Sequence, residues 1–162
     1  MKRGEMGFTL LEVLVVLAIT GVIIWPTAMA VTTLLTNPQR SADQNVVLHE
    51  VRNAGYWISR DVQMSKTVTP NGPGVFLTLV IPVSSNQTDD RSVDYLFDGS
   101  KLKRKEYYKS SDTLISETLI ADYIVTDKTT FSAVDVGLYR LTVRAAKGEA
   151  AVTINYEVSQ RL

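Results

Sequence analysis

The hydrophobic and polar positions divide this chain into an apolar N-terminal segment and a longer, mostly polar remainder. Apolar residues dominate from Phe8 to Leu35, and after Glu12 no charged residue occurs until Arg40. As an α-helix, this run of about 28 residues would be about 42 Å long, whereas the hydrocarbon core of a bilayer is about 30 Å thick. The segment is therefore long enough to span a membrane and to project beyond it.

A second periodicity follows the apolar run. Asn37-Pro38 interrupts the run, and because proline suits the first turn of a helix, a helix is expected to begin or continue there. From Pro38 to Ser65, apolar residues recur every three or four positions, which predicts an amphipathic helix lying on a sheet. Gly55 is expected to allow close packing. The apolar stripe consists of Val47, Val51, Ala54, Ile58 and Val62, and the charged residues that fall largely off it are Arg40, Asp43, Glu50, Arg60 and Asp61.

The remainder of the chain alternates in the manner of short strands. Turn-forming residues cluster at 69–74, and Asp98-Gly99 is typical of a hairpin turn. The predicted fold class is therefore α+β, with one long N-terminal helix packed on an antiparallel β-sheet head. Strands are expected at 75–81, 93–97, 101–108, 138–145 and 151–158, and residues 114–125 have mixed strand and turn character.

Composition excludes several classes of function. Lys and Arg number 17, as do Asp and Glu, so no bulk field attracts nucleic acid or anionic lipid. The absence of cysteine removes disulfides, thiolate catalysis and Cys-based metal sites, and a single histidine, His49, leaves little scope for a His-based site. No phosphate-binding loop or paired-carboxylate cleft is visible. We therefore expect no enzymatic activity, no cofactor and no metal.

Glu12 needs a physical reason, because a carboxylate within a membrane-length apolar segment is costly. A secretory signal peptide would end at the A-x-A pattern Ala28-Met29-Ala30, but its hydrophobic stretch would gain nothing from an acid. Cleavage after Gly7 would instead keep the helix and leave a cationic amine on Phe8, four residues before Glu12 and on the same helical face. A plain uncleaved anchor is the third interpretation.

A resemblance to a known family rests on the segment Gly7-Phe8-Thr9-Leu10-Leu11-Glu12-Val13. This segment resembles the class III leader junction of type IV pilins and type II secretion pseudopilins. The resemblance implies that prepilin peptidase cuts between Gly7 and Phe8 and methylates the new Phe8 amine. Glu12 would then pair with the Phe8 amine of a neighbouring subunit. Because leaving either charge unpaired costs several kcal/mol, the pair would set the axial stagger of the subunits.

The resemblance also implies a division of the chain into a leader at 1–7, a transmembrane or filament-core helix at 8–36, an amphipathic helix at 37–66 and an antiparallel β-sheet head at 67–162. Pro26 removes one backbone hydrogen bond and is expected to kink or locally melt the first helix.

Two further segments suggest a subtype. Residues 52–62 and 95–104 are similar to the helix and hairpin of J-type pseudopilins and W-type minor pilins. Major pilins often carry a C-terminal disulfide loop and major pseudopilins a C-terminal calcium loop. This chain has no cysteine, and no Asp-rich run lies near residue 162. Both observations favour a minor subunit.

The function implied by the resemblance is that of a structural subunit of a type IV pilus or a type II secretion filament. Its partners would be other pilin or pseudopilin subunits, prepilin peptidase, the inner-membrane assembly platform and membrane lipid. Lys2 and Arg3 favour a cytoplasmic N-terminus and a head outside the cytoplasmic membrane.

Two alternatives to this function stay open. One is a DNA-uptake or pilus-tip subunit that binds a ligand through Lys103 and Arg104, which lie in the only basic cluster of the chain. Nucleic acid is the less favoured partner, because lysines on a strand commonly keep a sheet edge soluble. The other alternative is a bitopic membrane anchor that does not polymerise.

Overall fold

The computed structural model describes residues 9–70, 74–83 and 90–161, apart from the side chains of 35–38. The chain comprises two compact units, Met1–Ser41 and Ala42–Leu162. One helix, α1 (Leu10–Met64), contributes to both units, and its assignment continues through Pro26 and Pro38. Asn37-Pro38 therefore continues the helix rather than starting a new one. The kink at Pro26 stays a prediction.

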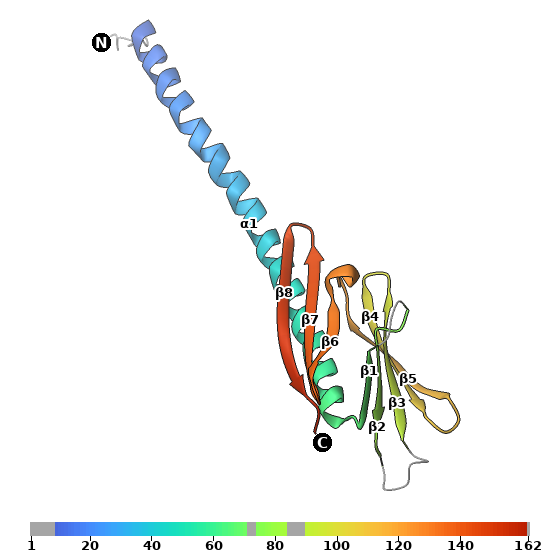
Figure 1. Ribbon diagram of the computed structural model, residues 1–162. Coiled ribbons are helices and arrows are strands. Elements are labelled where there is room, and N and C mark those ends of the chain that lie inside the picture. Colours follow the sequence, from blue (N-terminus) through green and yellow to red (C-terminus); the bar gives the residue numbers. More distant parts are fainter. Residues whose placement is uncertain (1–8, 71–73, 84–89, 162) are drawn as a thin grey trace. The chain divides into compact units, whose positions relative to one another are not determined.

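The second unit contains two antiparallel sheets rather than the one sheet expected, and Figure 1 shows both beside the C-terminal part of α1. The first sheet has the strand order β1-β2-β3-β4-β5 and the second the order β6-β7-β8. The bounds are β1 (Thr67–Pro70), β2 (Leu77–Ile81), β3 (Arg91–Asp98), β4 (Lys101–Tyr108), β5 (Thr113–Ala121), η2 (Thr126–Lys128), β6 (Thr130–Asp135), β7 (Leu138–Lys147) and β8 (Ala150–Ser159).

Turn chemistry accounts for two of the tight hairpins of the second unit. Asp98 pairs with Lys101 across the β3–β4 hairpin, and Gly99 in the turn has a φ of +60°, a backbone conformation that glycine adopts without steric cost. The predicted hairpin is therefore confirmed. Between β7 and β8, Gly148 has a φ of +58° and serves the same purpose.

The predicted apolar stripe of α1 is confirmed as the helix face of the core. All five stripe residues have no exposed surface. They pack with buried residues of both sheets, among them Leu79 and Val93 of the first sheet and Leu141 and Val143 of the second. One hydrophobic core thus joins the helix to both sheets, which explains why two small sheets are stable together.

Gly55 provides the close packing that the sequence suggested. A Cβ atom at this position would overlap the ring of Tyr156 on β8. The Tyr156 hydroxyl donates a hydrogen bond of 3.2 Å to the carbonyl oxygen of Val51, one turn earlier on the helix. Any side chain larger than hydrogen at position 55 would displace this tyrosine, so the residue fixes how β8 lies on α1.

Candidate functional site

The start of α1 holds the first candidate site. The Thr9 hydroxyl oxygen accepts a hydrogen bond of 3.3 Å from the Glu12 backbone N–H. Thr9 and Glu12 have the spacing of a capping box, which satisfies N–H groups that a helix terminus otherwise leaves unpaired. Glu12 also lies in the first turn, where the helix dipole favours an anion. The structure therefore supplies a local reason for an acid at this position.

Glu12 lies on an exposed surface, and no cation among residues 9–34 contacts its carboxylate. Gly7 and Phe8, the residues predicted for cleavage and methylation, lie outside the described residues. The pairing of Glu12 with the Phe8 amine therefore stays a prediction.

The first unit exposes an apolar surface that is unusual for a single protein chain. Every residue from 10 to 34 is exposed, including Trp25 at 77%. The helix is long and apolar enough to cross a membrane. The hydroxyls of Thr20 and Thr27 each donate a hydrogen bond of 2.7 Å to the carbonyl oxygen four residues earlier. Because these donors are satisfied within the helix, the polar residues of the segment suit an apolar surrounding.

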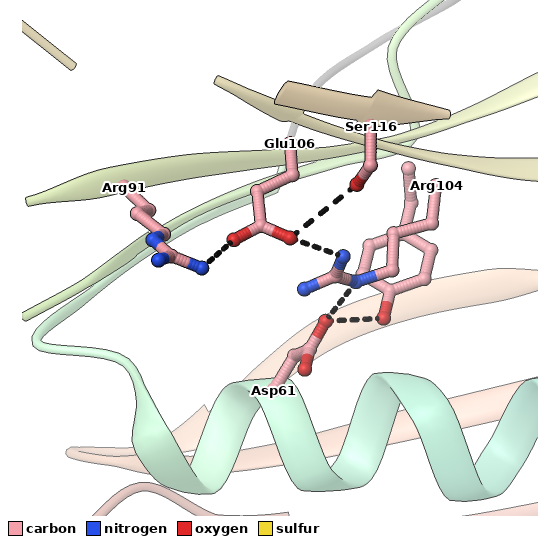
Figure 2. A network of polar contacts seen from close by, with 6 residues as sticks. Asp61, Arg91, Arg104, Glu106 and Ser116 are labelled. Atoms are coloured by element: carbon pink, nitrogen blue, oxygen red, sulfur yellow. Dashed lines mark hydrogen bonds and ion pairs between the residues drawn. The ribbon is translucent and has the colours of Figure 1, made fainter. Parts of the chain in front are cut away.

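The head holds a second site, a buried polar network that joins the helix to β3 and β4 (Figure 2). Asp61 is 1% exposed. Its Oδ2 atom accepts hydrogen bonds of 2.7 Å from the Tyr95 hydroxyl and 2.7 Å from Arg104 Nε. The Glu106 carboxylate accepts hydrogen bonds of 2.9 Å from Arg104 and 2.6 Å from Arg91. Two acids and two guanidinium groups thus neutralise one another beneath the sheet.

This network corrects one expectation from the sequence. The sequence placed Asp61 among the charged residues that fall largely off the apolar stripe, but Asp61 is buried, as are Ile58 and Val62 of the stripe. Arg104 compensates the charge, and it lies 43 residues further along the chain. A signal for Arg104 was present: on β4, positions 102, 104 and 106 share one face, and Leu102 is buried. The alternation therefore places Arg104 inward, unlike the lysines on either side of it.

Burial and charge set the protonation of this network. Burial raises the pKa of the Tyr95 phenol, and the neighbouring Asp61 carboxylate raises it further, so Tyr95 remains a hydrogen-bond donor. Burial alone would raise the pKa of Glu106, but the hydrogen bonds from Arg104 and Arg91 outweigh it and hold the pKa below its ordinary value of 4.5. Glu106 is therefore ionised and holds the two arginines in place.

The lowered pKa of Glu106 predicts an acid-sensitive head. Below pH 4.5, the ordinary pKa of the side chain, the unfolded chain takes up a proton before the folded chain does. Protonation then favours unfolding, and the stabilisation is lost as the pH falls through the folded pKa. We expect the thermal midpoint to decrease as the pH is lowered through this window. The decrease should be smaller in Glu106→Gln than in the parent protein. The exposed Glu157→Gln variant is the control. If the thermal midpoint fell equally steeply with pH in both variants, Glu106 would not be the source of the acid sensitivity.

The outward face of β4 carries Lys103, one of the two residues predicted as a candidate ligand contact, whereas Arg104, the other, faces inward. Lys103 Nζ lies 2.7 Å from Asp98 Oδ2 and 3.4 Å from Glu117 Oε1, and Lys105 lies 3.5 Å from Glu117 Oε2. The hydrogen bond from Lys103 lowers the pKa of Asp98. The charges of Lys103 and Arg104 are thus offset by acids of the head. A ligand contact at these two residues stays a prediction.

The fold and the helix start together define a class of protein. A long, apolar N-terminal helix followed by antiparallel sheets is an α+β, pilin-like architecture. The family described as the prokaryotic N-terminal methylation motif matches residues 3–28. This match supports the type IV pilin and pseudopilin family, and it indicates a membrane-anchored, single-pass subunit that prepilin peptidase processes.

The motif further implies interactions with other pilin subunits and with prepilin peptidase. Comparisons with curated proteins and with solved structures gave no significant match. The similarity of residues 52–62 and 95–104 to J-type and W-type minor subunits stays a prediction.

Proposed function

We propose that the chain is a minor pilin or pseudopilin, a structural subunit of a type IV pilus or type II secretion filament. It assembles through its N-terminal helix and performs no catalysis. The observation that carries this proposal is Glu12, an acid in the first helical turn of an exposed and mostly apolar segment. Glu12 also lies within the methylation motif. Such a segment needs lipid or other helices around it, and such an acid needs a cation.

Cleavage after Gly7 would supply that cation. The new Phe8 amine would be positively charged and, in a bundle of parallel helices, would lie near the Glu12 of an adjacent subunit. In an apolar surrounding the two charges attract strongly, whereas one unpaired charge costs several kcal/mol. A helix displaced along its axis would leave both charges unpaired. The pair therefore favours one axial stagger over all others.

The proposal assigns a role to each part of the chain. Residues 1–7 are the leader, 8–36 anchor the subunit and later form the filament core, 37–66 connect to the head, and 67–162 form the head that contacts neighbouring subunits. Before assembly the subunit waits in the cytoplasmic membrane with its head outside, in line with Lys2 and Arg3 near the N-terminus. The assembly platform of the inner membrane then extracts the helix into an extracytoplasmic filament.

The test is the mass of the mature chain, purified from cells with and without prepilin peptidase. We expect a chain that starts at methylated Phe8 when the peptidase is present and a chain with residues 1–7 when it is absent. Gly7→Ala should block most of the processing, because the resemblance assigns Gly7 to the position that the peptidase requires. The matched control is Gly4→Ala, three residues earlier in the leader, which should be processed normally. A mature chain starting at Val31 would establish a secretory signal peptide instead.

A further inference from the structure

A pocket of about 310 Å³ lies next to the buried network of the head. Its charged lining consists of Arg60 and Asp61 from α1, Arg91 from β3, and Arg104 and Glu106 from β4. Three guanidinium groups thus face two carboxylates, which leaves one net positive charge in the pocket. Because Asp61 and Glu106 are already paired with Arg104 and Arg91, the guanidinium of Arg60 is left to neutralise the single negative charge of a ligand.

Two of the three guanidinium groups, those of Arg91 and Arg60, have N–H donors without an acceptor among the described residues. Arg91 donates from one terminal nitrogen to Glu106, but its Nε atom is buried and has no hydrogen-bond partner among the described residues. A buried N–H without a partner costs about 1–3 kcal/mol. Arg60 is exposed, and no acid in the described ranges pairs with it; its guanidinium lies 5.4 Å from the centroid of the Trp57 ring.

The remaining wall of the pocket is apolar. Trp57, Met64, Ile81 and Val83 line it. Met64 is 42% exposed and Val83 51% exposed. Apolar groups beside unsatisfied donors are typical of small-ligand sites, in which a few polar contacts orient the ligand and apolar contacts hold it. A ligand that covers Met64 and Val83 would gain the favourable burial of apolar surface.

We propose that this pocket binds a carboxylate that is attached to a small apolar group. The carboxylate accepts hydrogen bonds from the guanidinium groups of Arg60, which is exposed, and of Arg91, whose side chain is 40% exposed. The apolar group packs between Trp57 and Val83. Guanidinium groups and carboxylates have matching planar geometry, which strengthens such bonds. Two sources carry this chemistry: a free branched carboxylic acid, and an acidic residue beside an apolar residue of a second protein. All residues of the site lie within the second compact unit, Ala42–Leu162, so it is independent of filament assembly.

The test is a fluorescence titration of the full chain in detergent micelles. The chain has two tryptophans, and Trp25→Phe leaves Trp57 as the reporter. We expect a saturable change with isovalerate and none with isoamyl alcohol, which has the same branched chain but no carboxylate. Arg60→Gln should weaken isovalerate binding by about tenfold, the value of one charged hydrogen bond. Arg52→Gln is the matched control, because Arg52 is exposed on the same helix and does not line the pocket.

Two further probes identify the source of the carboxylate and its specificity. An N-acetylated Asp-Leu peptide that binds much more tightly than isovalerate would establish a protein partner, whereas equal affinities would establish a free acid; both results support the site. Three results would overturn it: equal responses to isovalerate and isoamyl alcohol, binding of inorganic phosphate as tight as that of isovalerate, or unchanged affinity in an Arg60→Gln variant that retains its thermal midpoint.

Discussion

Replacing Glu12 by Ala should leave the subunit in the membrane but exclude it from filaments. The apolar helix still inserts, because removing an acid from a membrane-length segment lowers the cost of insertion. The charged Phe8 amine of a neighbouring subunit, however, loses its partner. A penalty of several kcal/mol for that unpaired charge corresponds to a drop in incorporation of about a hundredfold or more. The measurement is the amount of subunit in sheared filaments relative to the membrane fraction.

Two additional variants separate charge from shape in this experiment. Glu12→Gln keeps the size of the side chain but removes the charge, and it should fail to incorporate as Glu12→Ala does. Thr20→Ala changes an exposed polar residue of the same helix whose hydroxyl bonds only to the helix itself, so it should incorporate normally. If Glu12→Gln entered filaments at the parental level, the charge would have no role in assembly.

The second large effect is expected in the head. Arg104→Ala should lower the free energy of unfolding by about 3–5 kcal/mol, the cost of leaving a buried acid without its cation. Asp61 is 1% exposed, and of its two hydrogen-bond donors only the neutral Tyr95 would remain. Urea unfolding of the full chain in detergent measures the difference. Combining Arg104→Met with Asp61→Asn should recover much of the loss, because no charge then remains unpaired.

The adjacent Lys103→Ala variant is the matched control for Arg104→Ala. Lys103 lies next to Arg104 on β4 but faces outward, where its ion pairs with Asp98 and Glu117 are partly exposed. Exposed pairs of this kind are worth about 0–1 kcal/mol. Equal losses of stability in the two variants would show that Arg104 does not hold a buried acid.

The sequence carries enough information to predict the architecture of this protein but not the arrangement of its sheets. Periodicity alone identified the five core residues of α1, all without exposed surface, and the Gly99 hairpin. It did not identify β6 (Thr130–Asp135), whose residues are mostly exposed and so show no clear alternation. Nor did it identify β1 (Thr67–Pro70), a short, largely exposed strand that ends in a cluster of turn-forming residues.

The two candidate sites, the helix start and the buried network, also differ in how far the sequence predicts them. The helix start could be identified because its signal is local: Gly7, Phe8 and Glu12 lie within six positions of one another. The network around Asp61 could not, since its members come from α1, β3 and β4 and meet only in the folded head. A charged residue on a helix is exposed unless a distant partner compensates it, and periodicity carries no information about distant partners.

The central claim is that Glu12 neutralises the processed N-terminus of an adjacent subunit. A density map of filaments that contain this chain, resolved well enough to place side chains, tests it most directly. The account predicts the Glu12 carboxylate within about 4 Å of a neighbour's Phe8 nitrogen, the usual limit for an ion pair. A map in which every such nitrogen lies more than about 10 Å away, beyond the range of effective charge interaction in physiological salt, would contradict it.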